Sequence, residues 1–206
     1  LTALLYAIYF FFRFFEARAA GGRGATRDLL LGALCLGLAG LAKYNAAFLG
    51  LGIAVFVVFH DRQLLVQLRL YLAAALAIAL QAPVIIWNAT ERFASFGFIL
   101  AGRHAGPNTS LDSLPLLAFG IFIFVGPFLF WPVGRFAFSR KNAVPGSGFA
   151  RAAFDLSTLA IVALAFATLT LFHWNLVAYA AMLPFLAFYM RPRWLIAAQS
   201  IWGVAF

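Results

Sequence analysis

Charged residues are scarce in this sequence, at 10% of its 206 residues, whereas hydrophobic residues make up 65%. A mean hydropathy of +0.97 excludes a water-soluble domain of this length and predicts an integral membrane protein. Acidic residues are especially few, with six Asp and Glu against 15 Lys and Arg. Chemistry that needs paired carboxylates therefore has few candidate residues.

Cysteine is nearly absent as well, and the single Cys35 cannot form an internal disulfide. It lies in an apolar run with Gly32, Gly37 and Gly40, whose small size suits close packing of helices. The sequence also lacks a nucleotide-binding glycine motif, a cluster of metal-ligating residues and an internal repeat. An enzyme that takes a group from a nucleotide-activated donor at the cytoplasmic face is therefore disfavoured.

Apolar runs separated by short basic loops predict an all-α fold, a polytopic transmembrane helical bundle. An outer-membrane barrel would instead show alternating hydrophobicity in segments of about ten residues. We expect a single transmembrane domain over residues 1–206 with about eight spans, at residues 1–15, 29–42, 46–59, 70–87, 114–133, 153–172, 176–190 and 194–206. Several runs are short for a bilayer, so residues 29–59 could instead form one long helix with Lys43 in its middle.

The charges of the loops favour turns at the two polar breaks, residues 43–45 and 173–175. With turns at both, the loops on one side carry eleven Lys and Arg and the opposite loops carry three. Since cytoplasmic loops are enriched in Lys and Arg, we expect both breaks to face the extracytoplasmic side of a bacterial-type inner membrane. The net charge of +9 then reflects topology and anionic lipid, and it requires no nucleic-acid partner.

The predicted extracytoplasmic side holds most of the polar residues that are not simply basic. Cations, amides and indoles together suit a ligand with an anionic group and hydroxyls. The candidate site residues are Lys43, Tyr44, Asn45, Trp87, Asn88, Arg103, His104, His173, Trp174 and Asn175. Some of them also suit a purely structural role, because Lys43 at a helix end could simply reach the interface, and Trp87 and Trp174 fit an aromatic belt.

Three motifs carry a family resemblance. They are GALCLGLAGLAKY at residues 32–44, PVIIWN at residues 83–88 with FASF and Arg103-His104 after it, and His173-Trp174 with Tyr179 and Pro184. In order and spacing they resemble the middle of the dolichyl-phosphate-mannose-protein mannosyltransferase-like glycosyltransferases, a group that includes the lipid A aminoarabinose transferases. The resemblance extends from about residue 29 to residue 189.

The resemblance implies a GT-C membrane enzyme that moves a sugar from a polyprenyl-phosphate donor to an extracytoplasmic acceptor. Negative charge builds on the departing phosphate, and fixed cations stabilise that charge where water is scarce. The residues expected to bind the donor phosphate and lipid are Lys43, Tyr44, Arg103, His104 and His173. The residues expected at the rim of the site are Asn45, Trp87, Asn88, Trp174 and Asn175.

The resemblance also implies a catalytic acidic pair in the first extracytoplasmic loop, and this chain has none in that position. On the predicted outer side only Glu91 and Asp112 are acidic, and neither matches the family's pair. We expect the pair to precede Leu1, which would make the chain a fragment of a longer protein. Whether the chain is itself an enzyme stays open, as does a role for a divalent metal.

Two other classes of protein compete with the glycosyltransferase hypothesis. A noncatalytic accessory subunit, or a protein that binds anionic lipid, could keep the fold without the catalytic loop. A solute transporter ranks last, because paired ionisable residues and broken helices near the bilayer midplane are not evident in the sequence.

Overall fold

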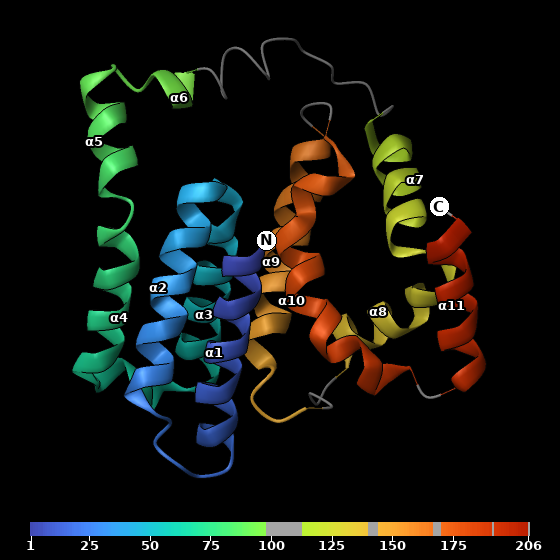
Figure 1. Cartoon of the computed structure of the whole chain (residues 1–206), viewed down its shortest axis with the longest axis horizontal. Coiled ribbons are helices and arrows are strands. Elements are labelled where there is room, and N and C mark those ends of the chain that lie inside the picture. The colour runs from blue at the N-terminus through green and yellow to red at the C-terminus, as the bar shows by residue number, and fades with distance from the viewer. Residues whose placement is uncertain (98–112, 140–143, 167–169, 191, 206) are drawn as a thin grey trace.

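The computed structural model describes residues 1–97, 113–139, 144–166, 170–190 and 192–205, and every regular element within them is a helix (Figure 1). The α-helices are α1 (Thr2–Ala19), α2 (Thr26–Ala42), α3 (Ala47–His60), α4 (Leu68–Ala79), α5 (Ala82–Thr90), α6 (Ala94–Gly97), α7 (Ser113–Val125), α8 (Phe130–Phe138), α9 (Gly148–Ala165), α10 (Leu176–Leu186) and α11 (Arg193–Ala205). Short 3-10 helices are η1 (Tyr44–Ala46), η2 (Arg62–Val66), η4 (Pro127–Leu129), η5 (Phe172–Asn175) and η6 (Ala187–Tyr189). The predicted all-α class is confirmed for the part of the chain described.

Helix α1 supplies much of the core and packs against α2 and α10. Its buried side chains recur every three or four residues and so lie on one face, at Leu4, Ala7, Ile8, Phe11, Phe14 and Phe15. The Phe15 ring stacks on Phe149 of α9 with centroids 5.3 Å apart, and Phe12 meets Phe185 of α10 at 5.2 Å. Aromatic side chains from the first helix therefore connect it to two helices far along the sequence.

Three glycines of α2 allow this helix to approach α1 and the junction between α4 and α5 closely. A Cβ placed at Gly32 would lie 3.0 Å from the Phe11 ring, and one at Gly37 would lie 2.5 Å from the Leu80 side chain. At Gly40 the nearest atom would be the Gln81 amide nitrogen, at 2.9 Å. The predicted packing role of these glycines is confirmed, since a larger side chain at each would displace a neighbour.

One described helix, α9, is long and apolar enough to cross a membrane by itself. Two broken pairs also qualify if each counts as one span, namely α4 with α5, bent by 48°, and residues 114–125 with 127–138, bent by 88°. Helices occur at all eight predicted positions, but about eight spans are not confirmed. The other helices are short or charged, since α2 has 17 residues and α1 contains Arg13, Glu16 and Arg18.

The sharper break lies at Gly126, whose φ of 82° favours glycine, and Pro127 follows it. Helix α11 supplies partners for carbonyl groups near the end of α7. The Gln199 Nε2 donates to the Val125 carbonyl at 2.9 Å, and the Trp202 indole donates to the Ile123 carbonyl at 3.2 Å. Side chains from α11 thus stabilise the broken end of α7.

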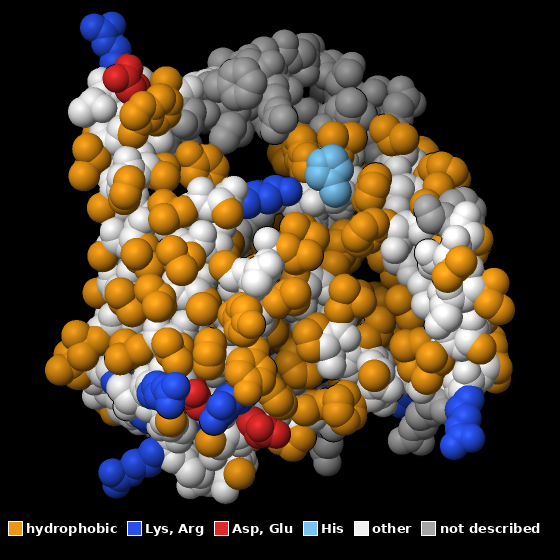
Figure 2. All heavy atoms as spheres, viewed as in Figure 1, with side chains coloured by type: hydrophobic (Ala, Val, Ile, Leu, Met, Phe, Trp, Pro, Cys, Tyr) orange, Lys and Arg blue, Asp and Glu red, His pale blue; other side chains and the backbone are white. Residues whose placement is uncertain are grey.

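The helices place the connecting segments at two ends of the molecule (Figure 1). At one end an ion pair joins Arg18 to Asp61, so the α1–α2 loop lies beside the α3–α4 connection. At the other end lie the turn after α2 and the turn before α10. Figure 2 shows Lys and Arg side chains gathered at the lower edge, beneath a hydrophobic middle. The alternative of one helix over residues 29–59 is wrong, while the cytoplasmic assignment of the basic end stays a prediction.

Candidate functional site

The first polar break is a tight turn between α2 and α3. Lys43 ends α2 with an extended backbone, at φ −158° and ψ 121°. Its N–H donates to the Ala39 carbonyl at 2.9 Å, and its own carbonyl accepts the Ala46 N–H at 3.0 Å. Lys43 is exposed at this helix end, so its ammonium can reach a lipid phosphate without being buried in apolar surroundings.

The second polar break forms η5, immediately before α10. The Trp174 N–H donates to the Leu171 carbonyl at 3.0 Å, and the Tyr179 hydroxyl donates to the Phe172 carbonyl at 3.2 Å. His173 is exposed, and its ring lies edge-on to Phe172 with centroids 5.6 Å apart. This turn is therefore held by its own backbone and by α10.

The two turns meet through Asn45, whose side-chain Nδ2 donates to the Trp174 carbonyl at 2.6 Å. These residues are 129 positions apart in the sequence. Asn175 anchors the second turn to α9, because its Oδ1 accepts from the Ser157 hydroxyl at 2.7 Å and its Nδ2 donates to the Thr158 hydroxyl at 3.1 Å. The structure thus brings both polar breaks together and fixes them against α9.

A cavity of about 600 Å³ lies where the turns meet. One wall comes from the end of α2 and the start of α3, and the other comes from α9 and the second turn. The lining residues are Leu41, Ala42, Lys43, Tyr44, Asn45, Phe48, Ala160, Ile161, Leu164 and Trp174. Among these residues Lys43 is the one with a charged side chain, and most of the others are apolar. The lining suits a ligand with an anionic head and a hydrocarbon tail.

The remaining predicted site residues lie elsewhere. Asn88 is buried and donates to the Val84 carbonyl of its own helix at 2.9 Å, while Trp87 is half exposed on α5. Neither residue lines the cavity, and the exposed His173 stands beside the cavity without lining it. Arg103 and His104 lie outside the described residues. Asn175 is 2% exposed, so its side chain supports the turn from behind instead of forming a rim.

The cavity lining contains no Asp or Glu within the described part of the chain. Nor do the described residues contain a group of three His, Cys, Asp or Glu side chains placed to hold a metal ion. The lining therefore offers a cation for binding a phosphate, whereas a general base would have to come from another segment.

The first part of the chain is similar to a known family. Residues 1–87 match the family model described as dolichyl-phosphate-mannose-protein mannosyltransferase. The family resemblance is confirmed for residues 1–87, and its extension to residue 189 stays a prediction. The match includes Lys43, Tyr44 and Asn45, whereas the motifs at residues 103–104 and 173–174 lie beyond it. No curated protein and no solved structure matches the chain significantly.

The family match indicates a glycosyltransferase-like membrane protein. Together with the apolar helices, it indicates an integral membrane protein.

Sequence reasoning missed the α9 wall of the cavity. Ala160, Ile161 and Leu164 look like ordinary apolar helix residues, and nothing in their pattern distinguishes a cavity lining from a core. Ser157 and Thr158 gave a weak signal, because hydroxyl side chains within an apolar membrane helix can hydrogen-bond to a neighbouring helix. Their partner, Asn175, could not be assigned without the packing of α9 against α10.

Proposed function

We propose that the chain forms the donor-binding membrane part of a glycosyltransferase that uses a polyprenyl-phosphate sugar. The observation that carries the proposal is the cavity whose charged lining residue, Lys43, lies within the segment that matches the mannosyltransferase family. We assign the phosphate to the Lys43 ammonium and the first isoprene units to the apolar wall. The cavity end faces the extracytoplasmic side of a bacterial-type inner membrane in this proposal.

The chemistry of sugar transfer explains why a cation is needed there. The acceptor nucleophile forms a bond to the anomeric carbon and gives its proton to the general base. The bond from that carbon to the phosphate oxygen breaks, and the phosphate oxygen keeps the electron pair. A positive charge already in position stabilises the departing phosphate and lowers the barrier. An ammonium acts as a point charge, and its position at a helix end keeps it near the depth of lipid headgroups.

Other residues complete the assignment around the cavity. Asn45 fixes the two turns to each other through its Nδ2, and we assign its Oδ1 to a hydroxyl of the sugar. The Trp174 and Tyr44 side chains line the same space and offer apolar faces to the sugar ring. By resemblance, Arg103 would hold two phosphate oxygens, and His104 or His173 would donate a hydrogen bond. The general base is assigned to a carboxylate outside this cavity.

Binding of undecaprenyl phosphate to the detergent-solubilised protein, followed by native mass spectrometry, tests the donor assignment. Lys43→Gln should weaken binding by about tenfold, because a charge-assisted contact to the phosphate is lost. Arg92→Gln is the matched control, since it removes one positive charge from an exposed residue that does not line the cavity. Equal binding by wild type and Lys43→Gln, or equal weakening by the control, would refute the assignment.

A noncatalytic role in binding anionic lipid is the second candidate, and the absence of Asp and Glu from the described lining favours it. The two functions differ in turnover. A transferase releases polyprenyl phosphate from polyprenyl-phosphate mannose, whereas an accessory or lipid-binding protein retains the intact donor. Binding that depends on Lys43 without any release, measured with the protein as it occurs in its native membrane, would support the second candidate.

A further inference from the structure

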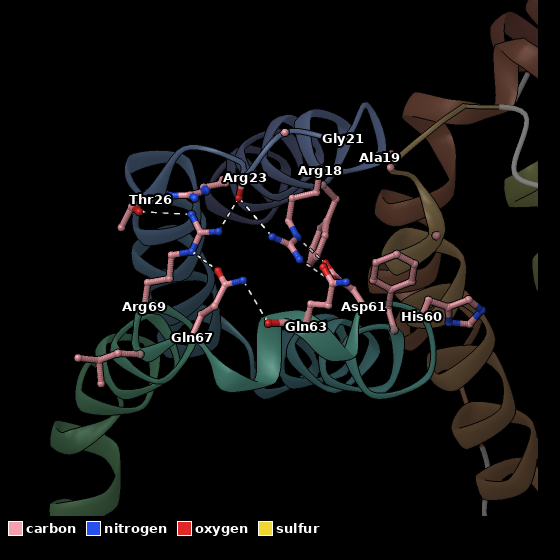
Figure 3. Close-up of a pocket in the computed structure, with 16 residues that line it drawn as sticks. Arg18, Ala19, Gly21, Arg23, Thr26, His60, Asp61, Gln63, Gln67 and Arg69 are labelled. Atoms are coloured by element: carbon pink, nitrogen blue, oxygen red, sulfur yellow. Dashed lines mark hydrogen bonds and ion pairs between the residues drawn. The ribbon is translucent and has the colours of Figure 1, made fainter.

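A second cavity, of about 1120 Å³ (Figure 3), is lined by residues at the end of α1 and the start of α2, whereas Lys43 lies at the other end of α2. It opens between the α1–α2 loop and the α3–α4 connection. The charged residues in its lining are Arg18, Arg23, Arg69 and Asp61, and other polar groups come from Thr26, His60, Gln63 and Gln67. The cavity is separate from the proposed donor site and shares no lining residue with it.

The Arg18 guanidinium is held rigidly on one side of this cavity. Its Nε and Nη2 donate to the two carboxylate oxygens of Asp61 in a bidentate ion pair. The two side chains are only 11% and 15% exposed. Its Nη1 donates to the Arg23 carbonyl at 3.3 Å, which ties the loop to the end of α1. Arg18 is therefore a preorganised cation whose charge Asp61 balances.

Arg69 approaches the same carbonyl from the other side (Figure 3). Its Nε donates to Gln67 Oε1 at 2.8 Å, its Nη1 donates to the Gly24 carbonyl at 2.7 Å, and its Nη2 donates to the Arg23 carbonyl. The Phe14 ring lies 5.2 Å from the Arg69 guanidinium and 5.8 Å from that of Arg18. Two guanidinium groups thus converge on one carbonyl and one aromatic ring.

The charges around this cavity do not balance. Three arginines face one carboxylate, and in the described structure no ion pair joins Arg23 or Arg69 to an acidic side chain. The Arg23 side chain is exposed, and within the described part of the chain no hydrogen bond holds it in place. Like charges this close repel each other, and a bound anion would relieve the repulsion. Guanidinium groups are well suited to binding phosphate, and the excess positive charge in this polar cavity favours a phosphate group as the bound anion.

We propose that this cavity binds a phosphate group, with Arg69 as a fixed contact and Arg23 as a mobile one that closes over it. The phosphate could belong to the headgroup of an anionic phospholipid in the adjacent leaflet or to a soluble phosphate compound. Both sources present anionic phosphate oxygens to the arginines. The proposal concerns a different end of the molecule from Lys43 and stands independently of the donor assignment.

Arg23→Gln is the test variant, because its exposed side chain contributes no described contact to the fold. Arg27→Gln is the matched control, since Arg27 is also exposed, lies four residues away and does not line the cavity. Each variant lowers the net charge by the same amount. Two probes are used with the whole chain. The first is phosphatidylglycerol diluted into phosphatidylcholine nanodiscs, and native mass spectrometry measures the lipid that the protein retains. The second is inorganic phosphate in neutral detergent, and binding is measured as a shift in the unfolding temperature at constant ionic strength.

Arg23→Gln should weaken binding of at least one probe by about fivefold to tenfold, while Arg27→Gln stays within about twofold of wild type. An effect on phosphatidylglycerol alone identifies a lipid headgroup, and an effect on inorganic phosphate identifies a soluble compound. Failure of wild type to bind either probe would overturn the proposal. Equal weakening by both variants would also overturn it, because it would indicate diffuse attraction to a basic surface.

Discussion

Substituting Gly52 by alanine tests the packing that positions the candidate site, because Gly52 lies where α3 crosses α9. A Cβ placed there would lie 2.4 Å from the Ala153 Cα and 2.5 Å from the Ala153 nitrogen. Both are backbone atoms, so no side-chain rotation can make room. Gly50 lies in the same helix, and a Cβ there would meet only the Leu36 side chain, at 3.4 Å. Comparing Gly52→Ala with Gly50→Ala therefore separates the cost of a clash from the helical preference of alanine, which both substitutions share.

The expected change in the free energy of unfolding follows from two opposing effects. Replacing glycine by alanine inside a helix stabilises it by about 0.5–1 kcal/mol, and both substitutions gain this. Forcing a methyl group into a filled contact costs about 1–3 kcal/mol, and only Gly52→Ala meets that cost. Gly52→Ala should therefore be about 1–3 kcal/mol less stable than Gly50→Ala, while Gly50→Ala should equal or exceed wild type.

Thermal unfolding in detergent, followed by tryptophan fluorescence, measures the comparison. Because α9 forms one wall of the Lys43 cavity, Gly52→Ala should also weaken binding of undecaprenyl phosphate, whereas Gly50→Ala should not. If the two variants unfold at the same temperature, α3 and α9 are not in backbone contact at Gly52, and the close packing of these two helices is wrong.

Three further substitutions probe other parts of the molecule. Asp61→Asn should destabilise the protein by about 3–5 kcal/mol in urea unfolding, since it leaves the largely buried Arg18 without its counter-charge. Adding Arg18→Leu to this variant should restore part of the lost stability. Asn175→Leu should lower the free energy of unfolding by about 1–3 kcal/mol, because Ser157 and Thr158 lose their hydrogen-bond partner. The control Ser200→Ala on α11 should change it by no more than about 0.5 kcal/mol. Equal effects of the two substitutions would contradict the hydrogen bonds between α9 and the second turn. In a Cys35→Ala background, a membrane-impermeant maleimide added outside the cell should label Tyr44→Cys and not Gln63→Cys, and the reverse pattern would invert the proposed orientation.

The positions of the helices could largely be predicted from the sequence. Lys43-Tyr44-Asn45 and His173-Trp174-Asn175 interrupt apolar runs with groups that are costly to bury, so chain reversals there were expected. Loop charge distinguished a hairpin from a single helix over residues 29–59, and the structure agrees. These signals are local in sequence, or they are sums over loops, and no knowledge of packing is needed to interpret them.

The depth and continuity of the helices could not be predicted in the same way. Pro83 and Pro127 lie near the two bends, but hydropathy alone cannot distinguish a bend of 48° from one of 88°. The larger bend depends on Gly126 and on hydrogen bonds from Gln199 and Trp202, more than 70 residues away in the sequence. Because these partners are remote, the number of spans was the least predictable feature of the fold.

The composition of the candidate site was partly predictable. Residues with a charge or an amide at a bilayer edge were recognisable from their type, and Lys43, Tyr44, Asn45 and Trp174 do line one cavity. Trp87 and Asn88 share that composition but do not line it, because α5 follows the bend after α4. The basic cavity at the opposite end was not anticipated, since its arginines look like ordinary residues of cytoplasmic loops.

Release of polyprenyl phosphate from polyprenyl-phosphate mannose tests the central claim most directly. It should be measured with the protein in its native membrane, comparing wild type, Lys43→Gln and the control Arg92→Gln. A donor site at Lys43 predicts release by wild type and Arg92→Gln and at least about a tenfold loss in Lys43→Gln. Release that is unchanged in Lys43→Gln, or absent from wild type, would contradict a glycosyltransferase donor site at Lys43.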